Sequence, residues 1–283
     1  MFTVLAAILF GLNGAVAADL VATIPPGNTA QMRSVLAASI LTILAYRRRA
    51  TRHGGRLLQL AGLGITLAMV TVSYLIAIER LGVGPGVTIQ FTGPLLVLVW
   101  LRFVRNRPVP GYAWTLAALA LVGVGLVSRA WDLSSLDPFG LAAAGVASVT
   151  FAAYLLGSGY LGRHLPTLSV TAYGFAFSAI LLLVAFPVRL PPAEPGVLLE
   201  LGWLVTMGTI VPFLLEVTAL RLTDAATVGV VATFEPVVAA AVAWVWLGQT
   251  LTILQILGGF VVVLAVGVVQ RLTGGEGEPT PIG

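Results

Sequence analysis

The chain has 283 residues, of which 58% are hydrophobic and 9% are charged. An ordinary soluble domain carries about 25% charged residues, so this sequence cannot cover a soluble surface. With a mean hydropathy of +1.02, most of the chain must lie in a lipid bilayer. The net charge is +4 and every basic residue is arginine. Because these arginines lie in short loops between apolar runs, we exclude nucleic acid as a partner.

The residue types that commonly hold metals or perform thiol chemistry are scarce. The sequence has no cysteine, which excludes disulfides, zinc–thiolate sites and thiol catalysis and leaves the redox compartment open. His53 and His164 are its two histidines, so a metal site built from several histidines is not expected. We therefore expect no metal and no cofactor.

Apolar runs divide the whole chain. A membrane-spanning helix needs about 20 apolar residues, and the runs predict an all-α membrane protein with ten transmembrane helices. They fall at residues 2–24, 30–47, 56–79, 84–103, 111–130, 138–161, 167–188, 197–221, 225–246 and 251–272. The polar tail at 273–283 is predicted to be disordered.

The two ends of the chain carry further expectations. A small-residue stretch near Ala17 resembles a signal-peptide cleavage site, but no basic residue precedes the first apolar run and the run continues past the site. We therefore favour a retained first helix. With the N-terminus inside, eleven arginines face the cytoplasm and four face outward. The positive-inside rule then places both termini in the cytoplasm, and we expect a bacterial inner membrane.

An internal repeat relates the two halves of the chain. Pro94 and Pro236 lie 142 residues apart in similar surroundings. Three more pairs keep this offset: Gly125 with Gly267, Ala77 with Ala219, and Tyr74 with Glu216. Residues 1–130 and 138–272 would each hold five spans, and an odd number of spans inserts the second repeat upside down. This inverted repeat is common in secondary transporters, although apolar helices also resemble one another by chance.

Several short motifs resemble a known family. Residues 234–238 (FEPVV) and 246–252 (WLGQTLT), followed by Gln255, Gly258 and Gly267, resemble the closing segment of EamA-type transporters of the drug/metabolite transporter (DMT) superfamily. Residues 90–95 (QFTGPL) and 107–109 (RPV) are similar to threonine/homoserine exporters within that family. The resemblance implies ten helices, both termini inside, alternating access, and export of amino acids or similar metabolites. Gln249 departs from the usual glutamate, which indicates a changed loop.

Polar side chains inside a bilayer are costly and mark candidate functional sites. Glu235 is the strongest candidate, since Pro236 weakens the helix beside it by removing a donor and clashing with the Ala232 carbonyl. We expect Glu235 to bind a substrate ammonium group or to accept a proton. The alternative is a protonated glutamate bonded to a neighbouring helix. Pro94 disturbs the helix at Gln90 in the same way, and Gln90 is either a substrate ligand or a packing contact.

Further candidates lie at similar depths. Tyr74 and Glu216 occupy matching repeat positions; their alternatives are an aromatic belt for Tyr74 and an ion pair with Arg221 for Glu216. Asn13 and Tyr154 lie well inside the bilayer, where they either line a cavity or pack. The predicted substrate-binding residues are therefore Asn13, Tyr74, Gln90, Tyr154, Glu216 and Glu235, with Pro94 and Pro236 as bending points. For Arg33 we favour snorkelling to the interface over a gate or a carboxylate-binding role.

The pattern favours a carrier over other kinds of membrane protein. No protease, metalloprotease or phosphate-binding motif occurs, so we predict that the protein is not an enzyme. A channel usually needs a ring of charge or an oligomeric pore. The main prediction is a secondary transporter that exports amino acids, with protons as candidate coupling ions. An exporter of cationic drugs and a channel for small solutes remain as alternatives.

Overall fold

Helices make up all the regular structure that can be described. The computed structural model describes residues 1–283 except 52, 132–136, 249 and 275–283. Within those residues there are α-helices and two π-helical segments and no strand. The prediction of an all-α fold is thereby confirmed for the described part of the chain. Gln249 and most of the predicted disordered tail lie outside the described residues.

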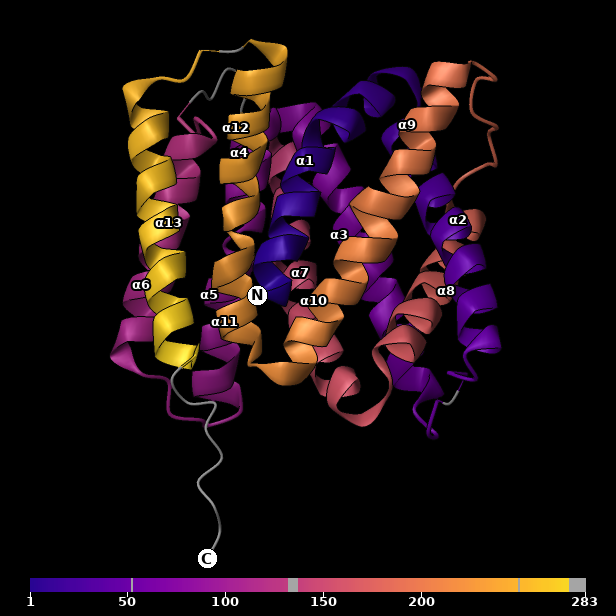
Figure 1. Ribbon diagram of the computed structural model, residues 1–283, viewed down its shortest axis with the longest axis horizontal. Helices are drawn as coiled ribbons and strands as arrows, with labels where there is room; N and C mark the ends of the chain where they lie inside the picture. Colours follow the sequence, from indigo (N-terminus) through magenta and orange to yellow (C-terminus); the bar gives the residue numbers. More distant parts are fainter. Residues whose placement is uncertain (52, 132–136, 249, 275–283) are drawn as a thin grey trace, which may run out of the picture.

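The helices run up and down through a single bundle (Figure 1). In chain order they are α1 (Phe2–Thr23), α2 (Pro26–Arg47), α3 (Leu57–Leu81), α4 (Val83–Gln90), α5 (Gly93–Val99), η1 (Trp100–Val104), α6 (Gly111–Val127), α7 (Pro138–His164), α8 (Thr167–Ala185), α9 (Pro195–Val205), η2 (Thr206–Ile210), α10 (Val211–Leu222), α11 (Ala225–Ala232), α12 (Phe234–Leu247) and α13 (Ile253–Gly274).

Many of these helices suit a bilayer. Among the described residues, seven helical stretches are long and apolar enough to cross a membrane: Leu57–Leu81, Gly84–Val104, Pro138–His164, Thr167–Ala185, Pro195–Leu222, Ala225–Val245 and Ile253–Leu272. Shorter apolar helices cover Phe2–Gly14 and Gly111–Val127. The remaining long helix, α2, is more polar and packs against α8 and α3.

Two of the apolar runs contain a break just before a proline. α4 ends at Gln90, and α5 begins at Gly93 with Pro94 in its first turn. α11 ends at Ala232, and α12 begins at Phe234 with Pro236 in its first turn. Threonine hydroxyls occupy both breaks: Thr92 donates to the Ile89 carbonyl (2.7 Å) and Thr233 to the Val230 carbonyl (2.5 Å). The two broken helices meet where Gly229 of α11 packs on Pro94.

Glycines let α1 approach its neighbours closely. A Cβ atom on Gly11 would lie 2.6 Å from the Val238 Cβ and 2.7 Å from the Glu235 carbonyl oxygen of α12. Gly208 of η2 lies directly against the side chain of Asn13. α1 therefore lies wedged between α12 and the η2–α10 segment, as Figure 1 shows near the middle of the bundle.

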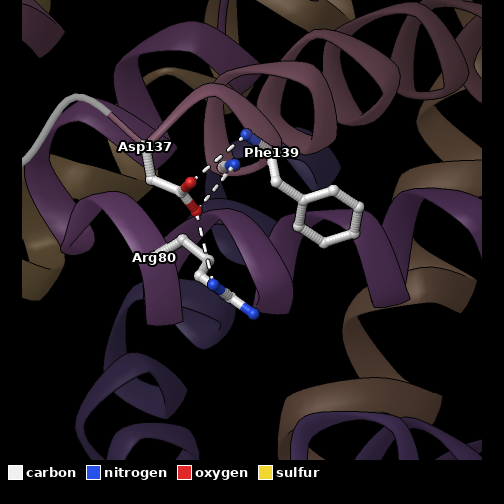
Figure 2. Close-up of polar contacts among 4 residues, drawn as sticks. Arg80, Asp137 and Phe139 are labelled. Atoms are coloured by element: carbon white, nitrogen blue, oxygen red, sulfur yellow. Dashed lines mark hydrogen bonds and ion pairs between the residues drawn. The ribbon is translucent and has the colours of Figure 1, made fainter.

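The two ends of the bundle differ. At one end, here called the Arg-rich face, lie the α2–α3 loop, residues 105–110, the α7–α8 turn and the α10–α11 turn (bottom of Figure 1). At the opposite face Asp137 caps α7 by accepting from the Phe139 and Gly140 backbone N–H groups (3.4 and 3.2 Å). Its carboxylate also pairs with Arg80 at the end of α3 (3.6 Å; Figure 2). This contact ties α3 to the start of α7.

Candidate functional site

Phe213 of α10 lies at the centre of a cluster of aromatic rings. Its ring packs edge-on against Phe10, Tyr154 and Phe175, with ring centres 5.2, 5.7 and 5.1 Å away. These rings come from α1, α7 and α8, so four helices meet at this point. Edge-to-face packing of this kind restricts the positions of the rings. We call the rings of Phe10, Tyr154, Phe175 and Phe213 the aromatic floor, because polar side chains lie around them.

Ionisable side chains surround this floor. Arg33 of α2 lies over the Phe213 ring, with its guanidinium carbon 5.6 Å from the ring centre. Arg33 is close enough to interact electrostatically with Glu235, Tyr154 and Tyr74. Glu216 interacts in the same way with Glu235 and Tyr154. The structure thus brings Tyr74, Tyr154, Glu216 and Glu235 together from α3, α7, α10 and α12.

The members of this cluster differ in accessibility. Tyr154 and Glu216 are buried, at 3% and 4% exposure. Arg33, Tyr74 and Glu235 keep part of their surface accessible. Asn13, at 6% exposure, lies one helical turn beyond Phe10 and packs on Gly208, so it borders the cluster from the α1 side. The arrangement has a buried carboxylate and tyrosine behind a more accessible carboxylate and guanidinium.

Gln90 lies at the break between α4 and α5. It ends α4, next to Phe91, which packs on Phe151 of α7 (5.8 Å between ring centres). No described contact links Gln90 with Glu235, Glu216 or Arg33. The structure thus brings four of the six predicted residues together, places Asn13 at their edge, and leaves Gln90 at the break in the other broken helix.

Several buried polar atoms, four at this cluster and two in α4, lack hydrogen-bond partners within the described protein. Each such atom ordinarily costs about 1–3 kcal/mol when it is buried without a partner. The atoms are Asn13 Oδ1, Arg33 Nε, Thr88 Oγ1, Gln90 Oε1, Tyr154 Oη and Ser158 Oγ. Although Tyr154 lies beside Glu216 and Ser158, its hydroxyl has no contact of hydrogen-bond geometry. The unpaired groups of Asn13, Arg33, Tyr154 and Ser158 adjoin the charged cluster, as is typical of a ligand site.

The interpretation of Arg33 as a snorkelling residue is wrong. Its guanidinium turns inward to Phe213 and donates to the Thr71 hydroxyl (3.4 Å), and its Nε is buried. α2 begins at Pro26, seven residues earlier, so Arg33 lies about 10 Å along the helix from its end. The sequence signal that identifies Arg33 as an interior residue is its distance from Pro26, where the helix starts. Its distance from residue 30, where the apolar run starts, is misleading.

Hydrogen bonds from α2 to α8 and to the two residues that follow it set the direction in which Arg33 points. Asn28 donates to the Pro187 carbonyl (2.8 Å), and Gln31 donates to the Leu182 and Phe186 carbonyls (3.1 and 2.9 Å). Ser34 bonds Ser178 (3.3 Å). These residues repeat every three positions and fasten one stripe of α2 to α8, which leaves Arg33 on the side that meets Phe213.

The alternative role for Glu216 is also not observed. Among the described residues, the ion pair closer than 4 Å is that of Arg80 with Asp137. Arg221 is exposed, whereas Glu216 is buried beside Tyr154. Glu216 therefore belongs to the interior cluster rather than to an interfacial ion pair. No group of metal-ligating side chains was found among the described residues.

A cleft of about 1160 Å³ opens at the Arg-rich face, between α3, α7 and the η1–α6 and α10–α11 connections. Beyond it, a cavity of about 10 Å³ lies against Tyr154, Ser158 and Phe213. Leu63 lines both spaces and packs between Gly157 of α7 and Gly174 of α8. One leucine side chain thus lies between the open cleft and the aromatic floor.

A bundle of apolar helices around an interior charged cluster is the arrangement expected of an integral membrane protein with a functional site in its interior, such as a transporter. The sequence model of the EamA-like transporter family matches residues 1–129 and 138–271. This chain belongs to the EamA-like transporter family, which falls within the DMT superfamily.

Named relatives agree with this assignment, and a solved structure shares the fold. The threonine/homoserine exporter RhtA of Salmonella typhimurium is 31% identical over 239 residues, covering 82% of this chain and 77% of its own. RhtA of Escherichia coli is 30% identical over 250 residues, covering 86% and 81%. A protein of known crystal structure shares the fold with a TM-score of 0.80 at 18% identity, covering 98% of both chains.

Proposed function

We propose that the protein is a secondary transporter that exports amino acids or similar small metabolites across the cytoplasmic membrane by alternating access. The observation that carries the proposal is the cluster around Phe213, where Glu235, Glu216 and Arg33 meet inside an apolar bundle. Charges at this depth are kept for function rather than for stability. Relatives named threonine/homoserine exporters support the substrate class.

The proposed architecture is ten crossings arranged as two inverted repeats, residues 1–130 and 138–272. The helix breaks support it, because Phe91 in the first break and Thr233 in the second are 142 positions apart, as are Pro94 and Pro236. Helix pairing supports it as well: α3 packs on α7 just as α1 packs on α10, which are equivalent pairs in such a repeat. Both termini would face the cytoplasm: α13 ends at the Arg-rich face, and α1 begins part-way up the bundle and runs away from that face (Figure 1).

In this scheme the structure corresponds to a state closed at the opposite face. The Arg80–Asp137 pair joins α3 and α7 there, while the wide cleft opens at the Arg-rich face. Substrate would reach the cluster from the cytoplasm once Leu63 moves aside. The breaks before Pro94 and Pro236 would allow α5 and α12 to tilt, closing the cytoplasmic path and opening the outer one.

Two acidic residues are candidate proton sites. Glu235 lies in the first turn of α12 at the break, and Glu216 lies close to it. A proton exchanged at either carboxylate would couple export to the proton gradient. An exporter of cationic drugs is the alternative that two interior carboxylates would also suit.

Counterflow in proteoliposomes tests the proposal. Vesicles containing the purified protein are preloaded with threonine, methionine, phenylalanine, an organic dication or a sugar phosphate, and uptake of labelled threonine and, in parallel, of labelled dication is followed. We expect uptake to be driven by preloaded amino acids and to saturate. Exchange with the dication alone would support the drug-exporter alternative, and unsaturable flux in protein-containing but not empty vesicles would support a channel.

A further inference from the structure

Arg33 is a partly buried interior cation with no carboxylate within ion-pair distance among the described residues. It donates to the Thr71 hydroxyl at 3.4 Å, a long bond, while its Nε is buried and has no partner among the described residues. No described carboxylate comes within 4 Å of it, since the ion pair at that distance is Arg80–Asp137. A guanidinium presents five N–H donors in a planar fork that matches a carboxylate. Most of this capacity is unused.

The Phe213 ring orients the guanidinium. Its centre lies 5.6 Å from the Arg33 guanidinium carbon, and three other rings hold Phe213 in place. A cation held over an aromatic face is stabilised by the ring, and here the contact also keeps the long side chain inside the bundle. The donor fork is therefore positioned before any ligand arrives.

An opposite charge faces the same region without touching Arg33. The Glu235 carboxylate interacts electrostatically with Arg33 across a gap longer than an ion pair. Both side chains keep accessible surface. A positive and a negative group held apart in this way match a ligand that carries both charges on neighbouring atoms.

We propose that Arg33 binds the carboxylate and Glu235 the ammonium group of a zwitterionic α-amino acid, so that this pair selects amino acids over organic cations. The inference rests on the proposed transport function and names the two groups that set its substrate class. Arg33 repels an amine that lacks a carboxylate, and Glu235 repels an acid that lacks an amine. The cluster therefore discriminates by charge at both ends of the ligand.

Binding and counterflow with three related ligands test this assignment. The ligands are threonine, its methyl ester, which lacks the carboxylate, and 3-hydroxybutyrate, which lacks the ammonium group. The variants are Arg33→Gln, Arg33→Lys and Glu235→Gln, with the exposed Arg189→Gln as the matched control. Size-exclusion profiles and thermal unfolding midpoints establish that each variant is folded.

Unmodified protein should bind threonine and neither analogue. Arg33→Gln should weaken threonine binding about 10- to 100-fold, the value of a charge-assisted hydrogen bond, and raise the affinity for the ester relative to threonine. Arg33→Lys, which keeps the charge, should lose less. Glu235→Gln should shift the preference toward 3-hydroxybutyrate, and Arg189→Gln should behave as the unmodified protein.

Two failures are distinguishable. An unchanged threonine-to-ester ratio in both Arg33 variants, in a protein that still exchanges threonine, would overturn the role of Arg33 and leave the transport function intact. Exchange of the ester or a dication but of no amino acid by the unmodified protein would overturn both the inference and the amino-acid function. If Arg33→Gln does not fold, Arg33→Lys decides.

Discussion

The ring and the hydroxyl group of Tyr154 have different roles. Its ring packs edge-on against Phe213, and the residue is 3% exposed. Its hydroxyl, however, has no hydrogen-bond partner among the described residues. A residue kept for packing alone would be better as phenylalanine, because an unpaired buried hydroxyl costs about 1–3 kcal/mol. The hydroxyl is therefore expected to serve the substrate.

Replacing Tyr154 with phenylalanine should leave stability intact and slow transport. Tyr154→Phe keeps the ring and removes the unpaired oxygen, so the thermal unfolding midpoint should stay the same or rise. Threonine exchange should fall about 3- to 10-fold, the value of one neutral hydrogen bond. Tyr46→Phe, at a tyrosine that is 78% exposed, is the control. Lower stability with unchanged exchange would show that the hydroxyl is structural.

At the residue scale the sequence identified most of the cluster, because a glutamate or tyrosine inside an apolar run stands out. It misjudged Arg33 for two physical reasons. The apolar run starts at residue 30, whereas the helix starts at Pro26 and carries Arg33 two turns deep. The direction of Arg33 also depends on the bonds of Asn28 and Gln31 to α8, which no single-helix pattern contains.

At the scale of helices, the close approach of α1 to α12 sets the position of the Glu235 backbone. α12 carries Glu235 in its first turn, and α1 reaches that turn through Gly11. The bends were expected near Pro94 and Pro236 because proline lacks a backbone N–H, and the helices are interrupted two or three residues earlier. The π-helical segments η1 and η2 were not expected, since a single widened turn leaves the apolar run unchanged.

A pair of glycine substitutions on α1 tests this contact. The added methyl of Gly11→Ala would lie 2.7 Å from the Glu235 carbonyl oxygen, a backbone atom that cannot easily move. We expect a loss of about 1–3 kcal/mol in unfolding free energy and slower exchange as α12 shifts. In Gly14→Ala the nearest atom is the Ala239 Cβ at 3.8 Å, so stability should hold. Equal thermal unfolding midpoints for the two variants would contradict the close packing.

At the scale of the whole molecule, the two faces of the bundle differ in openness. The wide cleft lies at the Arg-rich face, and the Arg80–Asp137 pair lies at the other (Figure 2). Apolar run length predicts the helices of such a bundle, because a bilayer fixes how long they must be. Run length does not predict which face of the bundle is open, because that depends on how the two halves pack against each other.

Cysteine labelling tests which face the cleft serves, and the natural chain, having no cysteine, gives no background. Ala153→Cys places a thiol in the cleft, and Leu190→Cys places one at an exposed position of the opposite face. In intact cells a membrane-impermeant maleimide should modify Leu190→Cys, and it should reach Ala153→Cys after permeabilisation. The reverse pattern would mean that the Arg-rich face lies outside.

The central claim is that the charged cluster around Phe213 is the substrate site, and threonine counterflow by Glu235→Gln tests it most directly. The substitution keeps the size of the side chain and removes its charge. Glu194→Gln, at an exposed glutamate before α9, is the matched control. We predict that Glu235→Gln inserts and unfolds like the unmodified protein yet exchanges threonine at least about tenfold more slowly, while Glu194→Gln exchanges normally. Full exchange by Glu235→Gln would place the substrate elsewhere in the bundle.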